Sequence, residues 1–201
     1  MILGSSSQWR RKVLSQAGCR TVDAWDPAID EKAIRHDGAE ALVLAISHAK
    51  ADALINRSTS GTDSQVERFL ICTDQVALCD GTIREKPENE AQAREFIHSY
   101  SVERKPVETC SGVVVVDLES GHREEGTYYN KIFFNEIPSE IVDQIVAQDV
   151  VYTCCGGFSV DWPLMGQFVS CITGDVDGVM GMPLCLLEEL FKRHQTKRVS
   201  L

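Results

Sequence analysis

No stretch of the 201-residue sequence stays apolar over the roughly 18 residues that a helix needs to cross a membrane. The first residues, Met1 to Gly4, pass directly into polar residues, so they lack the apolar segment of a signal peptide. From these two absences we expect a cytoplasmic protein without a membrane partner.

Basic residues are in the minority, because 20 Lys and Arg stand against 30 Asp and Glu, which gives a formal net charge of −10. A chain with this balance repels polyanions, so we expect no nucleic-acid partner. A small anionic ligand is compatible with this charge if a few Lys and Arg side chains converge locally.

Cysteine pairs with metal-binding spacing are also missing. None of the eight cysteines forms a Cys-x-x-Cys pair, which argues against a structural zinc site. Disulfides are not expected in a reducing compartment, and most of the cysteines stand within apolar runs, so we interpret them as buried free thiols. A redox or metal role for the neighbouring Cys154 and Cys155 is an alternative.

Strand and helix patterns alternate along the chain, with one antiparallel hairpin in the middle. Residues 107–118 and 127–134 predict the two strands of that hairpin. This alternation favours an α/β fold with a mixed sheet over an all-parallel one. We expect one domain over residues 1–201.

Three local predictions concern the boundaries of these elements. The polar Thr73-Asp74-Gln75 separates two apolar runs and is expected to interrupt the strand. Residues 57–67 are small and polar, which predicts a surface loop. Pro183 is expected to begin a last helix that ends near residue 193 and leaves a frayed tail after His194.

Small hydroxyl residues and two arginines follow the expected first strand. Ser5 to Ser7 predict a turn and N-cap, and Arg10 and Arg11 lie in the first turn of the helix. Free N–H groups at a helix N-terminus favour phosphate, and Ser and Arg side chains add hydrogen bonds. An ordinary N-cap with solvated arginines explains the same residues, and the spacing of a P-loop is absent.

Acidic residues at two places are candidates for chemistry. Asp74 stands between two apolar runs, and burying its carboxylate is costly unless it is paired or bound to a metal. Its position therefore favours a functional role. Asp30 and Glu31 could bind a hard cation or belong to a solvated turn.

Two lysines are candidates for contact with phosphate. Lys50 lies beside the apolar stripe of the expected long helix, where a lysine ordinarily extends to solvent but could also point into a phosphate site. Lys86 precedes Pro87, which fixes the backbone there. Neither lysine alone identifies a phosphate site.

In this order, these segments resemble the Maf family of nucleoside triphosphate pyrophosphatases. The similarity extends from residue 2 to about residue 190 and consists of seven short motifs in the family's order. The matching segments are Ser5, Ser7 and Arg10; Asp30-Glu31; residues 47–51; Thr73-Asp74-Gln75-Val76; Lys86-Pro87; Gly156-Gly157-Phe158; and residues 174–183.

The resemblance implies both a fold and a reaction. The fold would be of the inosine triphosphate pyrophosphatase type, an elongated two-lobed α/β body with a mixed twisted sheet and a central cleft. The reaction would convert a nucleoside triphosphate to the monophosphate and pyrophosphate with Mg²⁺ or Mn²⁺. Family analogy alone also suggests a homodimer.

The resemblance also implies roles for individual residues. Asp74 matches the proposed general base for the attacking water, and Glu31 matches an acid at the metal, which Asp74 would share. Arg10, Lys50 and Lys86 match the cationic residues around the triphosphate. The substrate-binding set implied by the resemblance comprises Ser5, Ser7, Trp9, Arg11, Gln75 and Asp161.

Within the family, Trp9-Arg10-Arg11 and Asp74-Gln75-Val76 match the 7-methyl-GTP subgroup more closely than the pyrimidine subgroup. A 7-methylguanine ring is cationic, so the face of Trp9 would attract it, and Asp161 could accept hydrogen bonds from a guanine edge. Trp9 could instead be a partly buried anchor of its helix. The chain departs from the family at Gln8 and at residues 161–166, which bears on base preference.

Two other functions remain as alternatives. One is a pyrophosphatase for pyrimidine triphosphates such as dTTP, UTP or CTP. The other is a non-catalytic nucleotide-binding regulator of cell division. The presence of Glu31, Lys50, Asp74 and Lys86 argues against a protein that has lost catalysis.

Overall fold

The computed structural model describes residues 1–19, 23–58 and 68–199. Most of the loop expected at residues 57–67 lies outside these residues, and residues 57 and 58 belong to a helix. The chain divides into two compact units, which are described separately. Unit 1 comprises Met1–Asp74, Ser111–Tyr128 and Gly181–Leu201, and unit 2 comprises Gln75–Cys110 and Tyr129–Met180.

The strands of the described residues form a mixed sheet in the order β2-β1-β3-β5-β6-β7, with β4 paired to β3. β1 is parallel to β2 and β3, whereas β4 is antiparallel to β3 and β7 is antiparallel to β6. The predicted mixed-sheet α/β fold is therefore confirmed. The strands are β1 (Ile2–Gly4), β2 (Asp23–Ala24), β3 (Phe69–Cys79), β4 (Thr82–Arg84), β5 (Val107–Asp117), β6 (Arg123–Phe134) and β7 (Val169–Thr173).

The helices connect these strands and include three short 3₁₀ turns. They are α1 (Gln8–Gln16), η1 (Glu31–Ala33), α2 (Ala39–Ser58), α3 (Glu90–Ser101), α4 (Ser139–Val146), η2 (Asp149–Thr153), η3 (Cys155–Gly157), α5 (Pro163–Gly166), α6 (Val176–Val179) and α7 (Leu184–Val199). The frayed tail expected after His194 is wrong as far as Val199, because α7 continues to that residue. The buried His194 lies within this helix, and Thr196 donates a hydrogen bond to the carbonyl of Lys192 at 3.0 Å.

The expected interruption at Thr73-Asp74-Gln75 is also wrong, because β3 is one continuous strand. Asp74 is 7% exposed within this strand, and the ammonium of Lys50 neutralises its carboxylate. A paired carboxylate can remain in a buried strand, whereas an unpaired one would favour a break. The hairpin is confirmed, although β6 begins earlier than expected, at Arg123.

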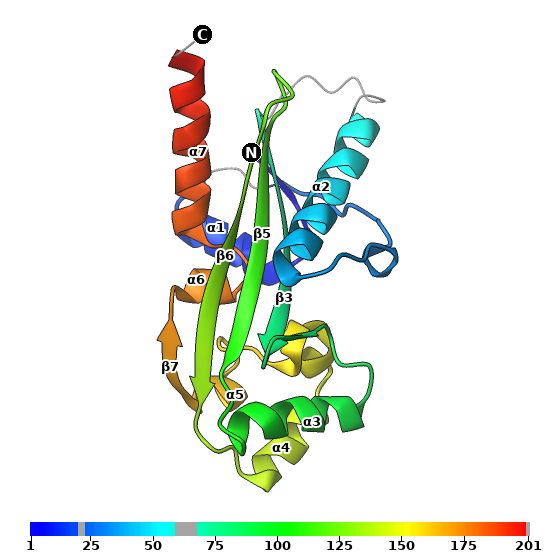
Figure 1. The fold of residues 1–201 in the computed structure, drawn as a ribbon, viewed down its shortest axis with the longest axis vertical. Coiled ribbons are helices and arrows are strands. Elements are labelled where there is room, and N and C mark those ends of the chain that lie inside the picture. Colours follow the sequence, from blue (N-terminus) through cyan, green and yellow to red (C-terminus); the bar gives the residue numbers. More distant parts are fainter. Residues whose placement is uncertain (20–22, 59–67, 200–201) are drawn as a thin grey trace. The chain divides into compact units, whose positions relative to one another are not determined.

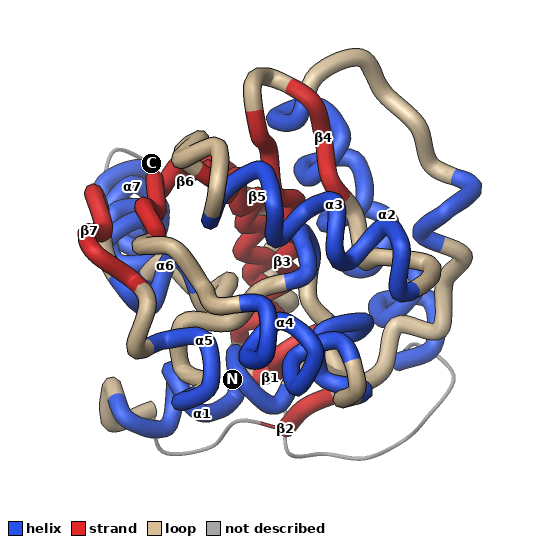
Figure 2. The backbone as a smooth tube through the Cα atoms, turned by 90° about the horizontal axis from the view of Figure 1, so that it is seen from below, coloured by secondary structure: helices blue, strands red, loops and turns tan. Residues whose placement is uncertain are grey.

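Helices α2 and α7 of unit 1 lie on opposite sides of its strands (Figure 1, Figure 2). Glycine permits close approach on both sides. A Cβ at Gly112 of β5 would lie 2.8 Å from the backbone of Val43 in α2, and a Cβ at Gly126 of β6 would lie 2.8 Å from Leu186 of α7. The buried core between α2 and the strands includes Ile2, Ala51, Leu54, Leu70, Cys72, Val114 and Val116.

A third glycine of unit 1 predicts a measurable stability effect. A Cβ at Gly4 would lie 2.4 Å from Sγ of Cys72 and 2.7 Å from Cδ1 of Leu54, and both side chains are buried. We therefore expect Gly4→Ala to lower the free energy of unfolding by about 1–3 kcal/mol through overpacking. Urea unfolding measures this, and Cys72→Ala in the same chain should restore part of the loss. Equal stability of Gly4→Ala and the wild type would contradict this packing.

Unit 2 has its own aromatic core. The ring centroid of Phe134 lies 4.7 Å from that of Tyr100 and 5.8 Å from that of Phe158. Helices α3 and α4 are joined by an ion pair between Arg94 and Asp143 at 2.8 Å. The buried hydrophobic cluster around these rings consists of residues of unit 2.

All eight cysteines belong to the described residues and are free thiols. Only Cys72, Cys79 and Cys110 are buried, so the prediction of buried thiols is wrong for Cys171 and Cys185, which are exposed. None of the helices that the structure describes is both long enough and apolar enough to span a membrane.

Candidate active site

The turn between β1 and α1 is organised by two serine hydroxyls. Ser7 is the N-cap of α1, and its side chain accepts a hydrogen bond from the backbone N–H of Arg10 at 3.4 Å. Oγ of the buried Ser5 accepts from the backbone N–H of Ser7 at 3.2 Å and from Nη1 of Arg10 at 3.1 Å. The predicted turn and N-cap are confirmed, and both hydroxyls act first on the protein itself.

Arg10 links this turn to strand β3. Its Nη1 also donates to the backbone carbonyl of Thr73 at 2.9 Å. Nη1 carries two hydrogens, so Ser5 and Thr73 together occupy it, and the rest of the guanidinium fork can serve another acceptor. The guanidinium is thereby fixed before any ligand arrives.

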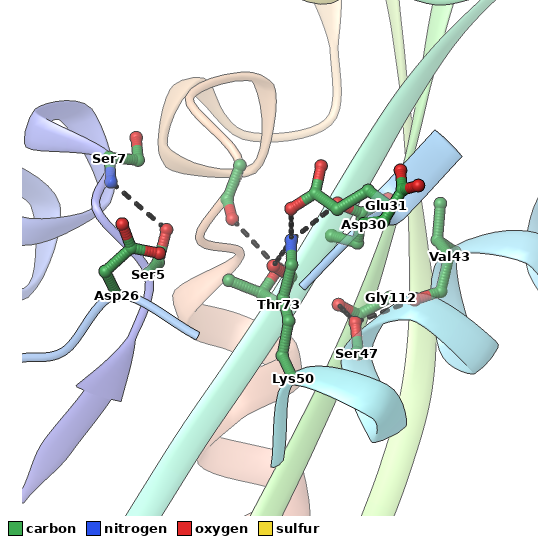
Figure 3. A network of polar contacts seen from close by, with 12 residues as sticks. Ser5, Ser7, Asp26, Asp30, Glu31, Val43, Ser47, Lys50, Thr73 and Gly112 are labelled. Atoms are coloured by element: carbon green, nitrogen blue, oxygen red, sulfur yellow. Dashed lines mark hydrogen bonds and ion pairs between the residues drawn. The ribbon is translucent and has the colours of Figure 1, made fainter. Parts of the chain in front are cut away.

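Lys50 is the centre of the polar cluster in unit 1 (Figure 3). Its ammonium lies 2.8 Å from Oδ1 of Asp74, 2.8 Å from Oε1 of Glu31 and 3.3 Å from the carbonyl oxygen of Thr73. The residue is 3% exposed, so the alternative of a lysine that extends to solvent is wrong. It is held inward by its place on α2, because Ser47 and Leu54, three residues before and four residues after it on the same helix face, are buried.

Glu31 and Asp74 approach this ammonium from different environments. Glu31 begins the 3₁₀ turn η1, which Asp30 caps by accepting a hydrogen bond from the N–H of Lys32 at 3.1 Å. The side chain of Glu31 is 45% exposed, whereas that of Asp74 is 10% exposed. The ammonium of Lys50 therefore pairs with one buried acid, Asp74, and one partly exposed acid, Glu31. Asp30 serves as the N-cap of η1.

Thr73 contributes a feature that sequence reasoning missed. Its carbonyl oxygen receives both Arg10 and Lys50, and its own hydroxyl donates to the carbonyl of Gly181 at 3.2 Å. The only signal in the sequence is the position of Thr73 next to Asp74, because a backbone acceptor has no residue preference. The fully buried Thr73 thus joins β3, α1, α2 and the segment before α7.

Trp9 and Arg11 lie in the first turn of α1. Arg11 is exposed, and Trp9 is partly buried. The ammonium of Lys12 lies 5.8 Å from the centroid of the Trp9 ring, within the range of a cation–π contact. The ring therefore already faces a positive charge of its own chain, and its predicted role toward a cationic base stays a prediction.

The other predicted site residues belong to unit 2, and contacts within that unit hold Gln75. Gln75 donates from Nε2 to the carbonyl of Gly178 at 2.9 Å and accepts from Sγ of Cys155 at 3.7 Å. Lys86 and Asp161 are exposed, in the segment before α3 and the turn before α5 respectively. The structure thus brings together Ser5, Ser7, Arg10, Glu31, Lys50 and Asp74, whereas Gln75, Lys86 and Asp161 belong to the other unit.

The turn at Cys155–Gly157 supports the segment around Lys86. The N–H of Gly156 donates to the carbonyl of Glu85 at 3.0 Å, and a Cβ at Gly157 would lie 3.0 Å from Pro87. Both glycines have positive φ, which permits this tight passage of the backbone. Burial raises the pKa of Cys154 despite Thr153 and Lys86 nearby, which argues against a reactive thiolate there.

Glu31 and Asp74 are the acids that could hold a divalent metal. Within residues 1–19, 23–58 and 68–199, no three His, Cys, Asp or Glu side chains gather as a metal site. Mg²⁺ commonly binds through one or two carboxylates and completes its shell with water and substrate phosphates. Glu31 and Asp74 therefore fit the ligands that a protein supplies to Mg²⁺, and the nearby Arg10 and Lys50 could contact the phosphates.

Hydroxyls at a helix N-terminus, two cations and two carboxylates are the groups that a phosphorylated small molecule and a hard cation require. The serine hydroxyls and Arg10 follow β1 and Asp74 lies in β3, whereas Lys50 and Glu31 come from α2 and η1. The chain belongs to the Maf family, because the family model described as Maf-like protein matches residues 1–194.

Named relatives cover almost the whole chain. It is 40% identical to a 7-methyl-GTP pyrophosphatase of Dictyostelium discoideum over 96% of both proteins. It is 29% identical to a 7-methyl-GTP pyrophosphatase of Idiomarina loihiensis, over 96% of this chain and 94% of the relative. It is also 29% identical to a dTTP/UTP pyrophosphatase of Vibrio vulnificus, over 94% of this chain and 96% of the relative.

Proposed function

We propose that this Maf-family chain is a nucleoside triphosphate pyrophosphatase whose substrate is 7-methyl-GTP, which it hydrolyses to 7-methyl-GMP and pyrophosphate. The observation that carries the reaction is the ammonium of Lys50 at 2.8 Å from both Glu31 and Asp74, beside the fixed guanidinium of Arg10. The relative from Dictyostelium discoideum supports the choice of base.

The reaction needs a water aligned with the α-phosphorus and a group that takes its proton. We assign that proton to Asp74, whose carboxylate is buried and directed at the cluster. The water oxygen bonds to the α-phosphorus, the bond from this phosphorus to the bridging oxygen breaks, and pyrophosphate leaves with that oxygen. Arg10, Lys50 and Lys86 would offset the charge that develops on the phosphate oxygens.

Ser5 and Ser7 hold the turn that presents the N-terminus of α1, and Arg11 offers a further cation on that helix. Mg²⁺ or Mn²⁺, bound by Glu31 and Asp74, would neutralise phosphate charge and polarise the phosphorus centre. Gln75 and Asp161 are assigned to recognition of the nucleobase, to which they offer an amide and a carboxylate.

A substrate panel tests the reaction and the base together. We expect release of pyrophosphate to be fastest from 7-methyl-GTP among 7-methyl-GTP, GTP, dTTP, UTP and CTP, and to stop with EDTA. Activity with EDTA present would contradict the metal assignment. Fastest release from a pyrimidine triphosphate would keep the reaction and replace the substrate.

Trp9 predicts a specific change in that preference. Removing its ring should lower kcat/KM for 7-methyl-GTP about tenfold, because a cation–π contact is lost, and should affect uncharged bases less. Steady-state kinetics of Trp9→Ala on 7-methyl-GTP and GTP measures the ratio. Trp9→Phe is the matched control and should keep part of the preference. An unchanged ratio in Trp9→Ala would remove Trp9 from base recognition.

A pyrophosphatase for pyrimidine nucleoside triphosphates is the second candidate, and the name of the Vibrio vulnificus relative favours it. The nucleotide-binding regulator is the third, and nucleotide binding without turnover of any panel member would favour it. Cytoplasmic location, a single domain over residues 1–201 and a homodimer stay predictions, the last of which light scattering tests.

A further inference from the structure

We propose that Lys50 is an internal cation that takes the metal's place in the nucleotide-free protein, so that divalent metal and nucleotide bind together. The inference rests on the proposed function, because it concerns the same site. It assigns Lys50 a second role besides contact with phosphate. In this role the lysine controls when Glu31 and Asp74 become metal ligands.

Protein oxygens occupy the hydrogen-bond donors of Lys50. An ammonium has three N–H donors and no acceptor. Three oxygens surround it, those of Glu31 and Asp74 at 2.8 Å and that of Thr73 at 3.3 Å. The donors and acceptors match in number, so no donor of Lys50 is left for a phosphate. Lys50 must therefore release at least one protein oxygen before it contacts substrate.

The positive charge of Lys50 offsets the negative charges of Glu31 and Asp74. Lys50 is 3% exposed and is the one cation in contact with both carboxylates among the described residues. A divalent ion bound to the same oxygens would lie within a few ångströms of the ammonium, where two positive charges repel strongly in a poorly solvated site. Metal and Lys50 therefore compete for Glu31 and Asp74.

A triphosphate resolves this competition. Its several negative charges offer Lys50 new acceptors, and the long, flexible lysine side chain can move to them. Glu31 and Asp74 then become available to the metal, which also binds the phosphates. The half-exposed side chain of Glu31 gives the metal a path from solvent. Because coupling is reciprocal, nucleotide and metal should raise each other's affinity by the same factor.

Metal binding without turnover tests the inference. Electron paramagnetic resonance of Mn²⁺ with the full chain and no nucleotide measures the affinity. We expect Lys50→Met to bind Mn²⁺ at least about tenfold more tightly than the wild type, because the competing charge is gone. Arg10→Met is the matched control, since Arg10 contacts the same Thr73 carbonyl but neither carboxylate. It should change the affinity by less than about threefold.

Two outcomes would overturn the inference. One is that the wild type and Lys50→Met bind Mn²⁺ with equal affinity. The other is that Arg10→Met gains as much Mn²⁺ affinity as Lys50→Met, which would show that removing any nearby positive charge has this effect. Adding Glu31→Gln to Lys50→Met should abolish the gain. These results do not depend on hydrolysis, so a silent substrate panel would contradict the proposed function and leave this test intact.

A measurement on the wild type covers the case that Lys50→Met does not fold. Thermal unfolding is followed with Mn²⁺ alone, with the α,β-methylene analogue of GTP alone, and with both. We expect Mn²⁺ alone to leave Tm unchanged and the two together to raise Tm above the analogue alone. A rise with Mn²⁺ alone as large as the rise with both would overturn the inference.

Discussion

Asp74→Asn is expected to lower kcat for pyrophosphate release by at least about a hundredfold while the chain keeps its fold. The amide has nearly the shape of the carboxylate but cannot take a proton from water. The substitution also removes one of the two carboxylate charges that pair with the ammonium of Lys50. Pyrophosphate release under saturating substrate and circular dichroism of the same sample measure both parts of the result.

Asp52→Asn is the matched control for this variant. Asp52 is an exposed acid on α2 that pairs with Arg123, so its amide should leave kcat unchanged. Turnover by Asp74→Asn at the wild-type rate would show that another group takes the proton. Loss of the fold in Asp74→Asn would make the carboxylate a structural partner of Lys50 first.

Lys50→Met is expected to lower kcat/KM by about 10²–10³-fold. The substitution keeps the apolar stem and removes the ammonium that would contact the triphosphate. Glu31 and Asp74 then repel each other and the incoming phosphates. Lys50→Arg should restore little, because a planar guanidinium cannot direct three donors to the oxygens that surround the lysine.

Lys105 provides the matched control, because it also lies between two carboxylates. Its ammonium is 2.8 Å from Glu103 and 2.9 Å from Asp80, but its side chain is 40% exposed. Lys105→Met should leave kcat/KM near the wild-type value, since exposed ion pairs contribute little. Equal losses in Lys50→Met and Lys105→Met would show that the effect is not specific to the cluster.

The sequence predicted features that depend on neighbouring residues. The turn at Ser5 to Ser7 and the cap of α1 are confirmed, because a serine hydroxyl satisfies the N–H groups of the next turn wherever the helix lies. The hairpin of β5 and β6 and the mixed sheet were predicted for the same reason, since alternation and turn residues are local signals. The order of the motifs also predicted the Maf family.

The tertiary structure decided how distant residues pair. The sequence could not tell whether Lys50 extends to solvent, and it wrongly divided β3 at Asp74. Both outcomes have one cause, because α2 and η1 bring Lys50 and Glu31 to a carboxylate in the middle of a strand. A local pattern shows a charge that is costly to bury, whereas the partner that offsets this cost comes from another part of the chain.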